Sequence, residues 1–86
     1  MIPSLGPVQV DILAVVAASD GMTAAEVAEI LRREPRDIHK AFRGLHDKAC
    51  LEVLTYRRRV GKASAVWGAT TTGRKALAAH RQEAAT

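Results

Sequence analysis

The sequence predicts a mainly α-helical domain that carries one small β-hairpin, an α+β arrangement with three helices before the hairpin and one after it. Three observations lead to this prediction. Apolar residues recur at helical spacing over three segments that precede Cys50. The following stretch changes to a β-type pattern that contains a glycine turn. A helical pattern then returns after a run of three threonines that begins at Thr70.

The first helix is expected over residues 7–18, with Pro7 in the first turn, where a missing amide leaves no hydrogen bond unmade. This helix is apolar nearly all round, and such a helix needs cover from two sides. A neighbouring helix would supply one cover. We expect a second copy of the chain, in a homodimer, to supply the other on a back face formed by Val10, Leu13 and Ala17.

The second helix has the clearest start in the chain. Thr23 and Glu26 have the spacing of a capping box, in which each side chain bonds the backbone amide of the other residue. The helix is expected to end near Arg32 and Arg33. Its predicted inner face consists of Val27, Ile30 and Leu31.

The third helix is expected to begin at Pro35, and its two faces differ in character. One face is apolar and is predicted to join the core; it consists of Ile38, Phe42, Leu45 and Ala49. The opposite face is cationic through its first two turns, with His39 at its flank; it carries Arg36, Lys40, Arg43 and Asp47.

The hairpin is expected to pair a strand at residues 51–56 with a strand at residues 64–69. A four-residue turn at 60–63 would place Tyr56 opposite Trp67, and such an aromatic pair would fix the register of the strands. The pairing would make these aromatic rings part of the base of the hairpin.

The last helix is expected to begin with Thr70 or Thr72 as its N-cap and to continue to about residue 82. The tail at residues 83–86 is expected to fray. The chain of 86 residues is therefore interpreted as a single domain, residues 1–86, with an ordered core over about residues 7–82.

The positive charge lies in the middle of the chain. Between Arg32 and Lys62 there are ten Lys or Arg against four acids, a local net charge of +6, whereas the other residues sum to −2 for a total of +4. A charge placed in this way indicates a polyanionic partner rather than a generally basic surface.

Two helices joined by a short turn, the second with a cationic outer face, are typical of a helix-turn-helix, and a basic hairpin after it is typical of a wing. Residues 45–53 (LHDKACLEV) resemble the end of the recognition helix and the first strand of MarR-like and ArsR-like winged-helix repressors. Residues 69–77 (ATTTGRKAL) resemble the entry to the helix after their wing. The resemblance extends over the layout of about residues 8–80 and implies a winged helix-turn-helix fold.

Two residues depart from the family pattern. Cys50 stands where the family usually has the glycine that turns left-handed to end the helix, and Ala69 stands where leucine is usual. A different helix cap or some backbone strain is expected at Cys50. The length leaves little room for the extra dimerisation helices of MarR-like proteins, so no small-molecule effector is evident.

The combined patterns predict sequence-specific binding to double-stranded DNA by a bacterial or phage transcription regulator. The third helix would enter the major groove and present to base edges Arg36, His39, Lys40 and Arg43. Phosphates would be contacted by the turn and by the amide end of the second helix, at Arg32, Arg33 and Thr23. The wing would lie on the backbone or in the minor groove through Arg57, Arg58, Arg59 and Lys62.

Two other functions fit the same layout. One is a winged-helix protein-interaction module without DNA binding, which would need exposed apolar anchors on the third helix. The other is RNA binding, which would favour exposed aromatic rings. The cationic helix face as a merely solvated surface is a third interpretation.

Other kinds of site have little support. His46 and Cys50 are spaced to share a metal if both lie on the third helix, but two ligands do not complete a site, so no metal is expected. The single cysteine is expected to be a buried thiol rather than a redox switch. No catalytic motif or cofactor motif is present, and no enzyme activity is expected. The absence of a signal-peptide pattern and of a long apolar run predicts a cytoplasmic protein without membrane contact.

Overall fold

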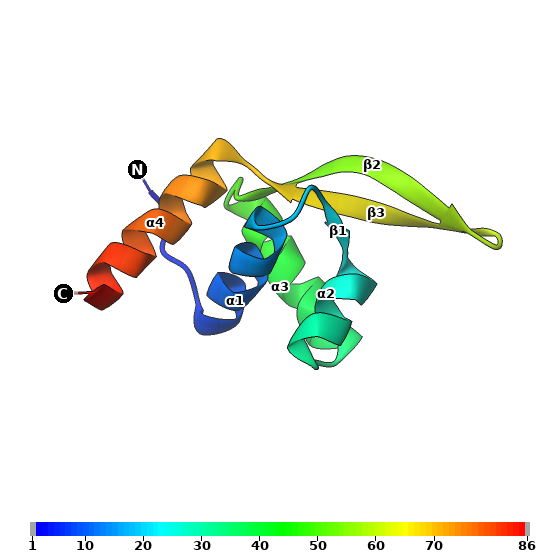
Figure 1. Ribbon diagram of the computed structural model, residues 1–86, viewed down its shortest axis with the longest axis horizontal. Coiled ribbons are helices and arrows are strands. Elements are labelled where there is room, and N and C mark those ends of the chain that lie inside the picture. The colour runs from blue at the N-terminus through cyan, green and yellow to red at the C-terminus, as the bar shows by residue number, and fades with distance from the viewer. Residues whose placement is uncertain (1, 86) are drawn as a thin grey trace.

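The computed structural model describes residues 2–85, and the side chains of all of these except Arg59, Ala84 and Ala85. The helices and strands follow the predicted order, with three helices before the hairpin and one after it (Figure 1). Their bounds are α1 Pro7–Ala17, β1 Met22–Thr23, α2 Ala24–Leu31, α3 Pro35–Asp47, β2 Leu51–Arg59, β3 Lys62–Ala69 and α4 Thr71–Ala85. The predicted α+β fold class is confirmed.

The core lies between the helices and the base of the sheet. Its largest fully buried side chains come from α1, α2, α3 and the start of β2, and they include Ile12, Leu13, Val16, Val27, Ile38, Leu45 and Leu51. The expectation that Leu13 lies on an uncovered back face is wrong, because its side chain is fully buried within this chain. In α2 the inner position expected for Ile30 is taken by Ala28, and Ile30 is 56% exposed.

The sheet contains a third strand that the sequence did not predict. The strand order is β1-β3-β2, and both pairs are antiparallel. The two-residue strand β1 pairs Met22 with Trp67 and Thr23 with Val66, so it joins the start of α2 to the middle of the sheet. In Figure 1 the outer half of the β2–β3 hairpin projects beyond the helices.

The predicted pairing of Tyr56 with Trp67 is wrong. Tyr56 pairs with Ala65, and Trp67 pairs with Val53. The turn has two residues rather than four, because Val60 and Gly61 both adopt positive φ angles, of 29° and 78°, and so close a tight hairpin. A β-bulge between Val53 and Thr55 then shifts the register again near the base of the hairpin.

The end of α3 has a left-handed residue, which is Ala49 rather than Cys50. Ala49 has a φ of 60°, and its amide donates to the carbonyl of His46 at 2.9 Å. The Cys50 amide donates to the Leu45 carbonyl at 2.8 Å, which completes a Schellman cap. The chain therefore uses the helix cap of the family pattern one residue earlier, and without a glycine.

The start of α4 is docked on this cap. Thr70 is the N-cap, as one of the two expected possibilities, and its hydroxyl accepts from the Gly73 amide at 2.9 Å. The Thr70 amide also donates to the Cys50 carbonyl at 3.0 Å. A Cβ atom at Gly73 would lie 2.2 Å from that carbonyl oxygen, so only glycine fits. The helix continues to Ala85, beyond its expected end, and residue 86 of the tail lies outside the described residues.

No helix within residues 2–85 combines the length and the apolar character that a membrane span requires.

Candidate nucleic-acid interface

The orientation of α3 is set by its buried face. Ile38, Phe42 and Leu45 are almost completely buried, which fixes the rotation of the helix about its axis. The opposite side is exposed and carries the predicted cations Arg36, Lys40 and Arg43, with exposed His39 at its flank. Over residues 2–85, none of these four side chains makes a hydrogen bond or an ion pair. The charges of Arg36, Lys40 and Arg43 are therefore available to a partner.

Aromatic contacts join α3 to the hairpin. The Trp67 ring meets the Phe42 ring edge-on, with the ring centroids 5.4 Å apart, and meets the His46 ring in the same way at 5.7 Å. His39 lies two helical turns before His46, on the same flank of α3. This flank is therefore the side of α3 that is turned toward the hairpin.

The turn between α2 and α3 carries two exposed cations, as predicted. Arg32 adopts a left-handed conformation with a φ of 53°, and the Arg33 amide donates to the Ala28 carbonyl at 3.0 Å to close α2. Glycine would adopt this conformation without the steric penalty. A strained residue that keeps a guanidinium at the surface marks this turn as a functional candidate.

The first turn of α1 lies beside the cationic side of α3. Together with Gly6–Gln9, Arg33 and Lys40 line a groove between the two helices. The Lys48 ammonium donates to the Gln9 side chain and to the Ser4 carbonyl, both at 2.7 Å. The start of α1 is thus tied to the end of α3, and the exposed surface of α3 continues onto it.

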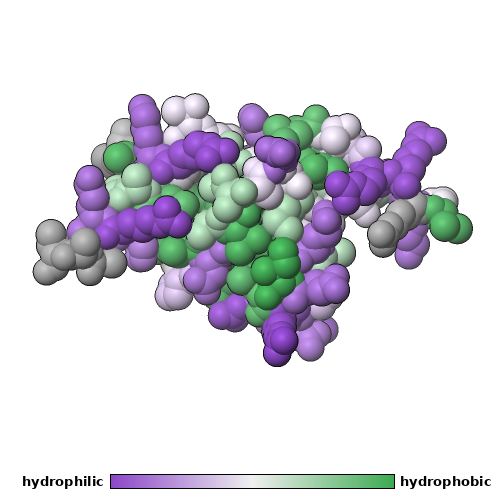
Figure 2. Space-filling model, in the orientation of Figure 1, coloured by the Kyte–Doolittle hydropathy of each residue, from purple (hydrophilic) through white to green (hydrophobic). Residues whose placement is uncertain are grey.

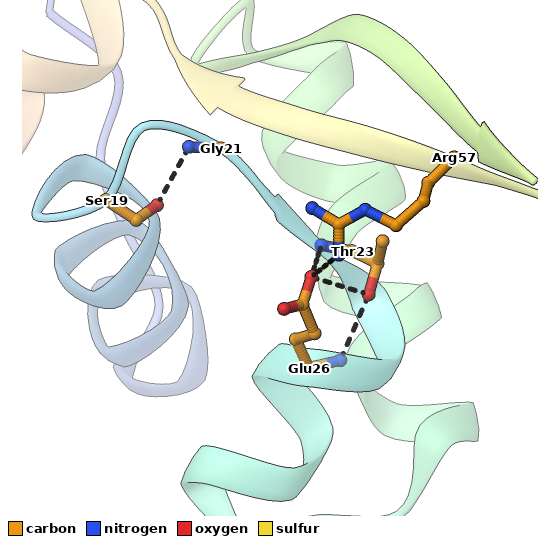
Figure 3. Close-up of polar contacts among 5 residues, drawn as sticks. All are labelled: Ser19, Gly21, Thr23, Glu26 and Arg57. Carbon is orange, nitrogen blue, oxygen red and sulfur yellow. Dashed lines mark hydrogen bonds and ion pairs between the residues drawn. The ribbon is translucent and has the colours of Figure 1, made fainter.

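Two of the predicted contact residues already have partners within the chain. Thr23 is buried, and its hydroxyl and amide form the predicted capping box with Glu26 (Figure 3). The Glu26 carboxylate also accepts from Arg57 of β2 at 3.1 Å. The Thr23 backbone hydrogen bond is the main cause that lowers the pKa of Glu26, and Arg57 lowers it further.

The hairpin has two faces with different residues. Residues that pair across antiparallel strands project on the same side, and alternate residues along one strand also share a side. The face that contains Trp67, named here the Trp67 face, consists of Val53, Tyr56, Arg58, Ala63, Ala65 and Trp67. The other, named the Arg57 face, includes Thr55, Arg57, Lys62, Ser64 and Val66.

The remaining predicted wing cations are Arg58, Arg59 and Lys62. Arg58 and Lys62 are exposed and make no ion pair in the described part of the chain. The backbone of Arg59 continues β2 to its end, but its side chain lies outside the described residues. The predicted cations therefore form one group on α3 and its preceding turn and a second group on the hairpin.

Sequence reasoning missed the ion pair between Glu26 and Arg57. The two residues are 31 positions apart, and the capping box accounted for Glu26 without a second role. The pairing of β1 with β3, through Met22 with Trp67 and Thr23 with Val66, brings the start of α2 close to the hairpin. No local pattern in the sequence signals this contact.

His46 and Cys50 do not share a site. His46 packs against Trp67, whereas Cys50 lies beyond the end of α3 and is fully buried. Burial raises the pKa of the Cys50 thiol, which keeps it protonated. Among the residues that the structure describes, no group of three His, Cys, Asp or Glu side chains is placed to hold a metal ion.

No protein-family model matches the sequence, and no curated protein matches it. Solved structures share its fold. A mutant of ZitR from Lactococcus lactis is similar with a TM-score of 0.72 at 22% identity, over 92% of this chain and 52% of ZitR. MepR from S. aureus, in a DNA complex, is similar with a TM-score of 0.72 at 22% identity, over 91% of this chain and 63% of MepR. PadR from Bacillus subtilis, in complex with operator DNA, has a TM-score of 0.78 at 11% identity, over 86% of this chain and 46% of PadR.

These likenesses show that the chain has the fold of winged-helix transcription regulators, as the resemblance in its sequence implied. In this fold α2 and α3 form the helix-turn-helix and the β2–β3 hairpin is the wing. The chain spans about half the length of ZitR and of PadR.

Proposed function

We propose that this chain binds double-stranded DNA in a sequence-specific manner as a bacterial or phage transcription regulator, with α3 in the major groove and the hairpin on the backbone or in the minor groove. The observation that carries the proposal is the outer face of α3, where exposed cations without internal partners stand opposite a fully buried face. The MepR and PadR structures, both in complex with DNA, support the same use of the fold.

Base recognition is assigned to Arg36, His39, Lys40 and Arg43. An α-helix fits the major groove, and arginine binds guanine through two hydrogen bonds that are worth about 1–3 kcal/mol of discrimination. Buried Phe42 and Leu45 hold the helix in one rotation, so the Cα positions of these four residues are fixed relative to the body of the protein. This is the geometry that direct readout of base edges requires.

Phosphate contacts are assigned to the helix turn and the wing. Arg32 and Arg33 are exposed at the turn, and Arg58 and Lys62 are exposed on the hairpin; Arg57 and Arg59 belong to the same cationic strand end. The contact at Thr23 would use the amides at the start of α2, where the Glu26 carboxylate now lies. A phosphate there competes with that carboxylate, so we assign this contact the smallest share of the affinity.

We also propose a homodimer, without a small-molecule effector, that acts in the cytoplasm and is not an enzyme. Two copies would double the DNA contact and read two half-sites. Support comes from apolar side chains that this chain leaves partly uncovered on its helices, among them Val10, Ala17 and Ile30. Figure 2 shows apolar side chains at the surface over the middle of the helical body.

Selection of preferred sites from random duplex DNA, followed by titration at two salt concentrations, tests the proposal. With six phosphate contacts, the logarithm of the binding constant should fall with the logarithm of salt concentration at a slope of about −5. Arg36→Ala and Arg43→Ala should weaken binding to the selected site and relax base preference, whereas Arg58→Ala should weaken binding to all sequences alike.

Lys75→Ala is the control, because Lys75 is an exposed cation on α4, and this helix lies at the end of the molecule opposite the tip of the hairpin (Figure 1). It should bind as the unmodified chain does. Equal affinity in the α3 variants, the hairpin variant and the control would contradict the placement of DNA. Binding to a protein or to RNA with no affinity for duplex DNA would favour one of the other two functions.

A further inference from the structure

The Trp67 face of the hairpin is the side that is turned toward α3. Trp67 contacts both Phe42 and His46 of that helix. Ala65 lies two residues before Trp67 on β3, so the two side chains share a side. Tyr56 pairs with Ala65, and its side chain therefore projects on this side as well. The face that α3 covers at the base of the hairpin therefore continues outward through Tyr56.

No packing contact or hydrogen bond in the described part of the chain explains why a tyrosine stands at position 56. Its side chain is 64% exposed, and its ring makes no aromatic contact and its hydroxyl no hydrogen bond in the described part of the chain. Across the ladder it meets only the small side chain of Ala65. A buried or half-buried tyrosine usually supports packing, but this ring contributes little to the core.

The side chain next to Tyr56 on this face is Arg58. Arg58 pairs with Ala63, which is also small, so the phenol and the guanidinium both stand clear of the hairpin surface. On the opposite face, Arg57 is held by the Glu26 carboxylate at 3.1 Å. The two faces thus differ: one has an internal partner for its arginine, and the other presents an arginine and a phenol without partners.

We propose that Tyr56 is a DNA-contacting residue whose phenolic hydroxyl donates a hydrogen bond to a backbone phosphate oxygen. This inference rests on the proposed function. With α3 in the major groove, the Trp67 face would lie along the DNA strand that borders this groove, between the helix and the tip of the hairpin. A phenol there adds a neutral donor beside the Arg58 cation, and hydrogen bonds to a charged acceptor are stronger than neutral ones.

Tyr56→Phe tests the inference, because it removes the hydroxyl and keeps the ring. The dissociation constant for a selected duplex should rise about ten-fold. The salt slope should not change, since no charge is lost, whereas Arg58→Ala should reduce the slope by about one. The matched control is Thr55→Val, which removes the neighbouring hydroxyl from the Arg57 face and should leave the dissociation constant unchanged.

A second measurement uses the fact that Tyr56 is the only tyrosine in the chain. Nitration by tetranitromethane should modify Tyr56 readily in the free protein and slow several-fold when saturating duplex DNA is present. Duplex binding that is unchanged in Tyr56→Phe, with nitration equally fast in the complex, would overturn this inference alone. Failure of the unmodified chain to bind any duplex would overturn the proposed function with it.

Discussion

Helix α3 and the β2–β3 hairpin both expose cations, but the body of the protein supports them differently. One side of α3 is almost completely buried, and the Trp67 ring packs against it. The outer half of the hairpin projects away from the helices (Figure 1). Within the described residues, one ion pair, between Arg57 and Glu26, joins that outer half to a helix.

The difference in support implies different roles for α3 and the hairpin in DNA binding. Core packing fixes the positions from which the side chains leave α3, and discrimination between bases depends on such fixed positions. Side chains on a projecting hairpin can adapt to a backbone whose charge is the same for every sequence. We therefore expect α3 to determine which site is bound and the hairpin to determine mainly how tightly.

The largest effect on stability is expected from removing the support of α3. Phe42→Ala should lower the free energy of unfolding by about 3–5 kcal/mol, because it leaves a cavity between α3 and Trp67. Urea denaturation, followed by the fluorescence of the only tryptophan, measures this change. Thr55→Ala on the hairpin should change the same quantity by less than about 0.5 kcal/mol. Similar losses for both variants would contradict the difference in support.

The junction that joins the two regions should give the next largest effect. Gly73→Ala would place its Cβ 2.2 Å from the Cys50 carbonyl oxygen, so α4 must shift away from the segment between α3 and β2. The expected loss is about 1–3 kcal/mol in the free energy of unfolding. The exposed neighbour Lys75→Ala is the control and should have almost no effect. A stable Gly73→Ala variant would show that the docking of α4 is looser than the structure indicates.

A smaller effect of opposite sign is expected at the free end of the hairpin. Val60 is a β-branched residue with a positive φ of 29°, followed by Gly61 at 78°. Asparagine favours this position in two-residue turns, so Val60→Asn should raise the free energy of unfolding by about 0.5–1 kcal/mol. Gly61→Ala should lower the free energy of unfolding, because an alanine is strained in this left-handed backbone conformation. Steric contact is not the cause, since nothing lies within 4 Å of the added Cβ. An unchanged urea midpoint in both variants would indicate that the turn frays before the body unfolds.

The same two regions differ in how far the sequence predicts them. The position and rotation of α3 follow from the spacing of Ile38, Phe42 and Leu45, and the structure places the predicted cations of this helix on its exposed side. Helical periodicity is a local property, so a single segment is enough to read it. The outward cations on α3 were predictable for this reason, whereas their binding to DNA stays a prediction.

The hairpin was harder to predict because its register depends on other segments. A valine before Gly61 is a poor turn signal, so the sequence suggested a longer loop. The bulge at Leu54 places its side chain over Gly21 and Gly68, where added Cβ atoms would lie 3.3 and 2.7 Å from its Cδ1. Strand β1 forms only by pairing with β3. Contacts between distant residues decided each of these features, and no local pattern contains them.

The smallest effect concerns the ion pair that joins the hairpin to α2. Because the pKa of Glu26 is lowered in the folded chain, its charged form stabilises the fold above the pKa of the unfolded state, and this contribution is lost as the pH falls through the folded pKa. Glu26→Gln keeps the capping-box spacing but removes the charge. Both groups are about half exposed, so the expected loss at pH 7 is only a few tenths of a kcal/mol.

Urea unfolding of Glu26→Gln and of the unmodified chain between pH 7 and pH 3 measures this effect. The difference in the free energy of unfolding should shrink toward zero at the acid end, where the carboxyl group is protonated in both states. Glu29→Gln is the matched control, because Glu29 is an exposed acid of the same helix whose side chain has no ion-pair partner in the described part of the chain. A pH-independent difference would mean that hydrogen bonding, rather than the charge of Glu26, attaches the hairpin to α2.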